Sequence, residues 1–347
     1  MSATTYMTGN GPRAFFASGL EAKPTAFSEI PVIDFAAMQG DDAAAKAAVG
    51  AAVRDACTKV GFFYAVNHGM PQDVIDATFG AAHNFFDKPL EEKKRVSITR
   101  SEAMRGYTAL LEENTNVENK GDMLEGFDLA LDLPETDPDV AAGVFGYAAN
   151  QWPDGEPAFR EALTTYHDAA RTVGARIFAA FALALELPED FFAAKITKPM
   201  AHMRVLHYPP QDGPIDESQI GIGAHSDYEC FTMLATDDVG ALQVLNAAGE
   251  WVAAPPMKGA FIVNVGDLMA RWTNDYFQST IHRAINRSGR ERYSIPFFFG
   301  PNSQDVIEVL PSCQSAERPA KYAPITAGDY IRSRFDDTYA HRREDEA

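Results

Sequence analysis

Residues 221–228 read Gly-Ile-Gly-Ala-His-Ser-Asp-Tyr, and this stretch places the imidazole of His225 two positions before the carboxylate of Asp227. On an extended chain, residues i and i+2 project from the same face. A further histidine, His282, follows Asp227 by 55 residues and lies in the strand-like run 280–285, Thr-Ile-His-Arg-Ala-Ile. The pattern predicts that two imidazoles and one carboxylate meet in a β-rich part of the fold.

These three side chains form a candidate metal site. Two histidines and a carboxylate on one face of a metal leave the opposite positions open, as in the facial triad of non-haem Fe(II) oxygenases. A structural zinc site usually closes with four protein ligands, often cysteines, and the nearby Cys230 has no cysteine partner in the sequence. An HxD tripeptide alone is common, so on this motif by itself an ordinary core or surface histidine remains the alternative.

A second motif, Arg292-Tyr-Ser294, begins ten residues after His282. Its guanidinium and hydroxyl share one strand face, and a guanidinium binds carboxylates through bidentate, charge-assisted hydrogen bonds. The pair is therefore a candidate carboxylate receptor. The alternative for Arg292 is a surface ion pair, but the apolar run 295–299, Ile-Pro-Phe-Phe-Phe, disfavours a surface position.

The pattern of the chain changes near residue 200. Before it, helical signals cover 41–59, 71–86 and 157–187, while 97–155 reads as mixed strand and loop. After it, short β-rich runs recur at intervals of about 8–12 residues, which is typical of an antiparallel sandwich or barrel. The predicted runs are 202–208, 230–236, 241–245, 260–265, 279–286 and 293–299, and the tail from Thr326 reads as a helix.

Further stretches carry a family resemblance that covers almost the whole chain. They are Ile30-Pro-Val-Ile-Asp34, Gly61-Phe-Phe-Tyr-Ala-Val-Asn-His-Gly69, residues 85–93, Arg105-Gly-Tyr107 and Asn264-Val-Gly-Asp267. Together with the HxD, His and RxS spacing, they resemble the isopenicillin N synthase-like family of Fe(II)/2-oxoglutarate-dependent oxygenases. The resemblance implies an α+β fold with a mainly β core, a double-stranded β-helix (jelly roll), with packed N-terminal helices and a C-terminal helix.

On this basis we expect four segments along the chain. They are an extended N-terminal arm (1–28), an N-terminal helical and mixed region (29–199), the Fe(II)/2-oxoglutarate jelly-roll core (200–303), and a C-terminal segment with a helix (304–347).

The resemblance also implies a role for individual residues. His225, Asp227 and His282 match the Fe(II) ligands. Four residues are expected at 2-oxoglutarate: Arg292, Ser294, Tyr208 and Arg204. Three are expected near the substrate: Tyr228, Glu113 and Leu206. The implied reaction oxidises a small molecule or natural product with O₂, most simply by hydroxylation, and releases succinate and CO₂. Ascorbate is an expected reductant.

Several alternatives stay open at this stage. An oxidase or cyclase of the isopenicillin N synthase type would not consume 2-oxoglutarate, and its RxS pair would hold the substrate's carboxylate. Local similarity to the bacterial ethylene-forming enzyme around 203–211 and 221–228 suggests ethylene formation, and Glu113 would suit a basic substrate; in the ordinary alternative Glu113 is an exposed loop residue. A zinc hydrolase and a non-catalytic small-molecule sensor on the same fold are the remaining readings.

The amino-acid composition disfavours some classes of binding partner. The 347 residues contain 30 Lys and Arg against 49 Asp and Glu, a formal charge of −19. Such a charge disfavours nucleic acid and anionic membranes as partners, because both attract basic surfaces. Cysteines are sparse, and no apparent signal peptide or apolar run of about 18 residues is present. We therefore expect a cytoplasmic enzyme with a small-molecule substrate, as a monomer or weak homo-oligomer.

Overall fold

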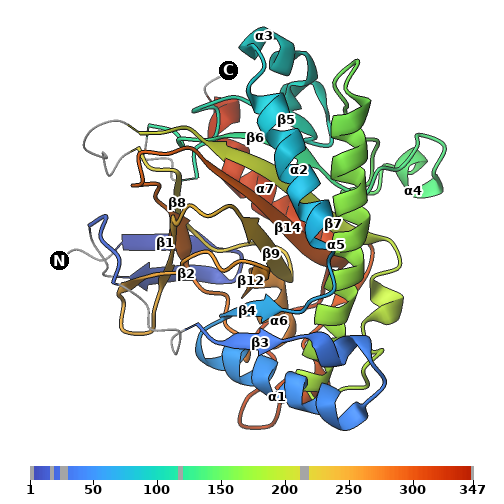
Figure 1. The fold of residues 1–347 in the computed structure, drawn as a ribbon. Coiled ribbons are helices and arrows are strands. Elements are labelled where there is room, and N and C mark those ends of the chain that lie inside the picture. Colours follow the sequence, from blue (N-terminus) through green and yellow to red (C-terminus); the bar gives the residue numbers. More distant parts are fainter. Residues whose placement is uncertain (1–3, 16–18, 24–29, 116–119, 212–218, 345–347) are drawn as a thin grey trace.

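The structure is a computed structural model that describes residues 4–15, 19–23, 30–115, 120–211 and 219–344 (Figure 1). Its α-helices are α1 (Ala43–Lys59), α2 (Gln72–Phe86), α3 (Leu90–Lys93), α4 (Pro138–Ala141), α5 (Pro157–Ala184), α6 (Asp267–Trp272) and α7 (Ala327–Glu344). Short 3-10 helices are η1 (Ala36–Gln39), η2 (Lys94–Val96), η3 (Ile98–Arg100), η4 (Ala193–Lys195) and η5 (Pro311–Cys313). Within these described ranges, none of the helices is long and apolar enough to cross a membrane.

The larger of the two main sheets has eight strands in the order β3-β4-β12-β9-β14-β7-β6-β5. Its strands pair antiparallel except β3 with β4, which run parallel. The strand bounds are β3 (Val32–Asp34), β4 (Phe62–Val66), β5 (Gly106–Thr108), β6 (Glu125–Leu129), β7 (Pro199–Tyr208), β9 (Phe231–Thr236), β12 (Ala260–Val265) and β14 (Arg292–Asn302).

A smaller sheet of four strands faces this one, in the order β11-β10-β13-β8. Its strands are β8 (Ile222–His225), β10 (Leu242–Leu245), β11 (Trp251–Ala253) and β13 (His282–Ala284). Leu242 and Val244 of β10 pack against Phe62 and Ile262 of the larger sheet. The two facing sheets form the jelly roll that the resemblance implied, so the predicted fold class is confirmed.

A layer of helices covers the outer face of the larger sheet. Figure 1 shows α2 and α5 crossing this face and α1 below them. Leu163, Ile177 and Phe181 of α5 are fully buried in the same core as Met203 and Val205 of β7. Because strand side chains alternate, Arg204, which lies between these two residues of β7, points to the other face, between the sheets.

The long helix predicted over 157–187 ends at Ala184, three residues early. Glu186 adopts a φ of +60°, a left-handed conformation that cannot continue a right-handed helix. The N–H of Leu187 then donates to the carbonyl of Ala182 and closes the last turn.

The N-terminal segment departs from the expected extended arm. Residues 4–15 form a hairpin of β1 (Thr4–Thr8) and β2 (Gly11–Phe15), whereas 1–3, 16–18 and 24–29 lie outside the described residues. The turn signal that the prediction missed is Asn10-Gly11, since Gly11 adopts a φ of +110° that other residues rarely adopt. The hairpin lies against α7: a side chain at Gly9 would clash with Tyr330 and Arg334.

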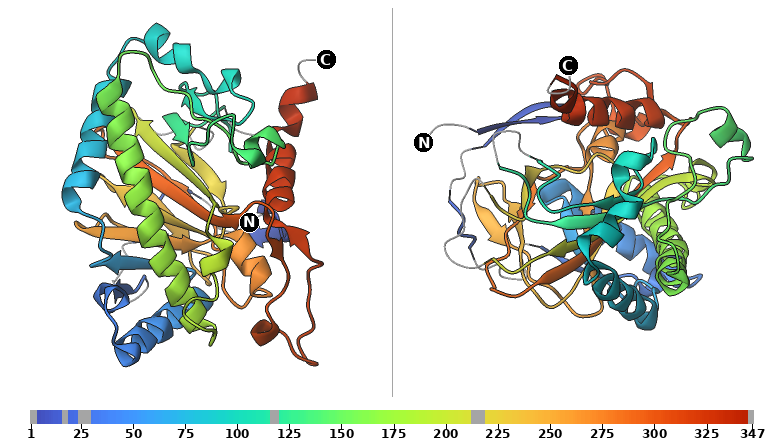
Figure 2. Two further views of the ribbon diagram at one scale, coloured as in Figure 1. Left: turned by 90° about the vertical axis from the view of Figure 1, so that its right-hand side faces the viewer. Right: turned by 90° about the horizontal axis from the view of Figure 1, so that it is seen from above.

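The C-terminal helix α7 lies on the side of the molecule away from α5 (Figure 2). A short two-stranded pairing of β15 (Val306–Ile307) with β16 (Ile325–Thr326) precedes it. Ile331, Arg332 and Phe335 of this helix line the cavity between the two main sheets. The helix predicted from Thr326 is thus present, and it forms part of the cavity wall.

Candidate metal and co-substrate site

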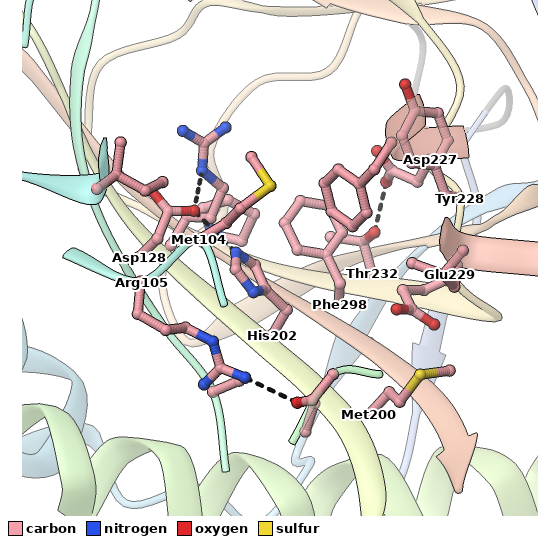
Figure 3. A pocket seen from close by; sticks show the side chains of 18 of the residues that line it. Met104, Arg105, Asp128, Met200, His202, Asp227, Tyr228, Glu229, Thr232 and Phe298 are labelled. Carbon is pink, nitrogen blue, oxygen red and sulfur yellow. Dashed lines mark hydrogen bonds and ion pairs between the residues drawn. The ribbon is translucent and has the colours of Figure 1, made fainter. Parts of the chain in front are cut away.

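A cavity of about 750 Å³ lies between the two sheets and is also lined by residues from 98–105, 113–115 and 140–149 and by α7. Figure 3 shows part of its lining. All ten site residues predicted from the sequence line this one cavity: Glu113, Arg204, Leu206, Tyr208, His225, Asp227, Tyr228, His282, Arg292 and Ser294. The sheet pairing brings together residues that are up to 181 positions apart in the chain.

The metal-binding candidates meet where β8 and β13 pair. His225 and His282 are opposite each other in this antiparallel pair, with their ring centroids 4.3 Å apart. The Oδ1 atom of Asp227 lies 3.6 Å from Nε2 of His225 and 3.7 Å from Nε2 of His282. One ligand atom from each residue lies within 4.8 Å of the others, so the three side chains could hold a metal ion.

Hydrogen bonds orient the side chains of His225, Asp227 and His282 toward a common metal position. The Nδ1 atoms of His225 and His282 lie 2.8 Å and 3.1 Å from the carbonyls of Gly223 and Thr280. A carbonyl only accepts, so Nδ1 carries the proton and each Nε2 keeps its lone pair for a metal. On the other side, Oδ2 of Asp227 accepts hydrogen bonds from Thr232 and Asn264, which leaves Oδ1 toward the histidines.

Burial and charge keep His225 and Asp227 in the protonation states that ligate metals. Burial, with the neighbouring His282, lowers the pKa of His225 to about 4, so its imidazole is neutral at pH 7. Burial raises the pKa of Asp227, but the two imidazoles and the hydrogen bonds from Thr232 and Asn264 outweigh it, so the pKa lies below its ordinary value. A neutral imidazole and an ionised carboxylate are the forms that bind a divalent metal.

The carboxylate receptor predicted from Arg292 and Ser294 lies in the same cavity on β14. Arg292 is 2% exposed, its Nη1 lies 3.4 Å from Oγ of Ser294, and its guanidinium carbon lies 4.7 Å from the ring centroid of Tyr208. No acidic side chain in the described part of the chain forms an ion pair with it, and its Nε has no hydrogen-bond partner there. A buried cation without a carboxylate partner fits an anionic ligand.

Arg204, the other arginine predicted at 2-oxoglutarate, has acidic partners. Its Nη2 lies 2.5 Å from Oε1 of Glu113, and its Nε lies 2.8 Å from Oδ1 of Asp128. These ion pairs favour a role in holding the two carboxylates in place. A contact with 2-oxoglutarate stays a prediction for this residue.

The three predicted substrate residues occupy different walls. Glu113 is largely buried against Arg204, so it is not the exposed loop residue of the alternative reading. Leu206 neighbours Ser294 across the β7–β14 pair. Tyr228 follows Asp227 and lies under Arg334 of α7, whose guanidinium carbon is 4.9 Å from the ring centroid.

Sequence reasoning missed several polar residues of the cavity, notably Asp128, His202 and Glu229. His202 was detectable, since it shares the i, i+2 alternation of Arg204 and Leu206. Asp128 had no such signal, because it lies in the irregular region before residue 200. Glu229 is buried beside Asp227. Its burial and the negative charge of Asp227 together raise the pKa of Glu229 to about 8.

The fold and the cavity together define a class of protein. An open cluster of two histidines and a carboxylate needs a ligand that completes the metal's coordination, and the buried arginine in the same cavity suits a ligand with a distal carboxylate. Within a jelly roll, these are the features of non-haem iron oxygenases that use 2-oxoglutarate as co-substrate.

Comparisons with known proteins agree with this class. Residues 30–155 match the family "non-haem dioxygenase in morphine synthesis N-terminal", and residues 199–301 match the "2OG-Fe(II) oxygenase superfamily". The 2-oxoglutarate-Fe(II) type oxidoreductase hxnY of Emericella nidulans is 40% identical over 314 residues, which cover 89% of this chain and 90% of the relative.

Two solved structures are similar as well. A full-length protein of Neurospora crassa, solved in complex with alpha-KG, has a TM-score of 0.80 and 29% identity, covering 89% of this chain and 96% of that one. JOX2 in complex with 2OG, Fe and JA has a TM-score of 0.71 and 30% identity, covering 90% and 85%.

The chain belongs to the 2OG-Fe(II) oxygenase superfamily. It is a 2-oxoglutarate-dependent non-haem iron dioxygenase that uses Fe(II), 2-oxoglutarate and O₂ and acts on small molecules. The predicted family, enzyme class and cofactors are confirmed.

Proposed function

We propose that His225, Asp227 and His282 bind Fe(II), and that Arg292 and Ser294, with Tyr208 beside them, hold the distal carboxylate of 2-oxoglutarate in the hydroxylation of a small molecule. One observation carries this assignment: the oriented ligand cluster lines the same cavity as the buried Arg292, which has no acidic partner among the described residues. The bound metal would supply the activation of O₂ that is coupled to decarboxylation of 2-oxoglutarate.

The protein's own part is to bind and orient. Asn264 and Thr232 hold Asp227 so that one oxygen faces the metal position. Ser294 lies beside the guanidinium of Arg292, and the hydroxyl and guanidinium together offer donors to a carboxylate. The walls exclude bulk water from this region, since Arg292, Ser294 and Tyr208 are each at most 2% exposed.

We further propose that the substrate lies against Tyr228, Leu206 and the Glu113–Arg204 pair. All four residues line the cavity. The similar structure of JOX2 was solved in complex with JA besides 2OG and Fe, which supports a small organic substrate here. The three free cysteines are buried, which fits a reducing cytoplasm, and we expect a monomer or weak homo-oligomer without nucleic-acid or membrane partners.

The test is a substrate screen of the purified protein with Fe(II), 2-oxoglutarate and O₂, with and without ascorbate, scored by succinate and by oxidised product. We expect substrate-dependent succinate formation that disappears in Arg292→Leu. Substrate turnover that leaves 2-oxoglutarate unconsumed would favour an oxidase or cyclase, and ethylene release would favour the ethylene-forming reaction. Hydrolysis with zinc but none with Fe(II) would contradict the proposal, and binding of small molecules without turnover would favour a sensor.

A further inference from the structure

An acid–histidine pair that the proposed function does not use lies on the wall of the cavity. Nε2 of His202 lies 2.8 Å from Oδ1 of Asp128. His202 is on β7 and Asp128 on β6, and both line the cavity. Figure 3 shows the pair beside Met104 and Phe298.

The partners of Asp128 determine which ring nitrogen of His202 carries the proton. Oδ1 of Asp128 also lies 2.8 Å from Nε of Arg204, and this cation favours the ionised carboxylate. An ionised carboxylate only accepts hydrogen bonds, so Nε2 of His202 is the protonated nitrogen. Burial lowers the pKa of His202 despite its bond to Asp128, so the ring is neutral and Nδ1 carries a lone pair.

Among the described residues, that lone pair has no donor. Nε2 is the ring nitrogen of His202 that makes a side-chain hydrogen bond within this part of the chain, and Nδ1 makes none. The side chain is 26% exposed although it lies inside the cavity wall, so the ring borders open cavity space. A neutral imidazole nitrogen at such a place accepts a hydrogen bond from whatever fills the cavity.

The neighbouring charges point to a neutral ligand group. The carboxylates of Asp128 and Glu113 are balanced by Arg204 and by the buried Arg105, which hydrogen-bonds Asn150 and Gly146. No unbalanced negative charge is left among these described residues to hold an ammonium group. A substrate carboxylate would place its own lone pairs against the lone pair of Nδ1.

We propose that Nδ1 of His202 accepts a hydrogen bond from a neutral donor of the substrate, and that this donor is the N–H of an amide or N–H heterocycle. Asp128 is then a positioning residue that fixes the acceptor form of the ring, and Arg204 with Glu113 holds Asp128. This inference rests on the proposed function, because it takes the cavity beside the metal cluster as the substrate site.

The chain contains a matched control for this pair. Glu125 and His207 face each other on the same two strands, with Nδ1 of His207 lying 2.8 Å from Oε1 of Glu125. This second pair is on the opposite strand face and does not line the cavity. The other nitrogen of His207 lies 3.3 Å from Glu291, so both ring nitrogens have acidic neighbours.

The first experiment uses the wild-type holoenzyme and needs no variant. Succinate formation is measured with a panel of lactams and N–H heterocycles, such as 2-piperidone and 2-pyridone, each beside its N-methyl analogue and a carboxylic acid of similar size. We expect N–H members to stimulate succinate formation and N-methylation to lower kcat/KM by on the order of tenfold or more. N-methyl analogues or acids that match or exceed the N–H compounds overturn the inference, as does a panel in which no N–H member stimulates.

The second experiment converts Nδ1 of His202 from a hydrogen-bond acceptor into a donor. In Asp128→Asn the amide can donate to Nε2, which moves the ring proton to Nδ1 and turns the acceptor into a donor. We expect a drop of about tenfold or more in kcat/KM for the best N–H substrate, mainly through KM, while His207→Gln leaves the preference for N–H over N-methyl compounds unchanged. Equal preferences in wild type and Asp128→Asn, with both folded by thermal melting, contradict the role of Asp128.

Different results would contradict the proposed function and the role of His202. A wild-type protein that neither binds 2-oxoglutarate in the presence of Fe(II) or Mn(II), by calorimetry, nor forms succinate contradicts the proposed function itself. A wild-type protein that does both but shows no preference for N–H compounds contradicts the role of His202 alone.

Discussion

Nδ2 of Asn264 donates a hydrogen bond of 2.6 Å to Oδ2 of Asp227. Asn264 stands on β12 and is 3% exposed, so bulk water has little access to this bond. The carboxylate is thereby held with its other oxygen toward the two histidines. The geometry of the metal cluster thus depends on Asn264, which acts through Asp227.

Asn264→Ala is expected to weaken metal binding without removing a ligand. Loss of a contact that orients a ligand typically lowers metal affinity or activity about 10- to 100-fold. Titration of the apo protein with Mn(II) or Fe(II) under anaerobic conditions measures the effect. Asn246→Ala is the matched control, because Asn246 hydrogen-bonds the Glu250 turn beyond the cavity. Equal affinities for Asn264→Ala and the control would contradict the positioning role.

Removing the carboxylate itself is expected to have a larger effect. Asp227→Ala leaves two histidines, too few to hold the metal in place, so Fe(II)-dependent succinate formation should fall below detection. The fold should persist, because the substitution removes a buried charge instead of creating one. Circular dichroism and thermal melting check the fold. Turnover by Asp227→Ala at the Fe(II) concentration used to assay the wild type would disprove the assignment of Asp227 as a ligand.

Arg292→Lys tests the carboxylate receptor. Lysine keeps the positive charge but loses the planar pair of donors that fits a carboxylate. We expect KM for 2-oxoglutarate to rise about 10- to 100-fold, with a smaller change in kcat. Arg287→Lys serves as the control, since that arginine pairs with Glu21 at the surface. A rise in KM for the organic substrate alone would place its carboxylate, not that of 2-oxoglutarate, at Arg292.

The sequence alone predicts those parts of the site whose residues lie close together in the chain. His225 and Asp227 lie two residues apart, and Arg292 and Ser294 repeat that spacing, so strand alternation alone places each pair on one face. The long gap to His282 was bridged by the family resemblance. Helices were predicted where apolar residues recur at helical spacing, as in α5.

Other features depend on pairing between distant strands. Asp128 and His202 are 74 residues apart and meet because β6 and β7 are neighbours in the sheet. No local pattern in 97–155 signals that contact. The N-terminal hairpin was missed for a different reason: its Asn10-Gly11 turn signal stands in a segment of weak periodicity, and its position depends on packing against α7.

Stability should depend on pH through His167, a buried residue of α5 that is remote from the metal cluster. Its Nε2 lies 3.0 Å from the carbonyl of Ala201, and burial lowers its pKa to about 4 from an ordinary value of 6.5. Between these values the unfolded chain binds more protons than the folded one, so protonation favours unfolding as the pH falls. The stabilisation is complete above pH 6.5, and about 2 kcal/mol of it is lost on going from pH 7.5 to pH 5.

His167→Gln keeps a donor for Ala201 but cannot titrate, so its unfolding free energy should fall less over that interval than that of the wild type. Urea denaturation of the metal-free proteins at both pH values measures this, and parallel pH profiles for the two proteins would refute the assignment.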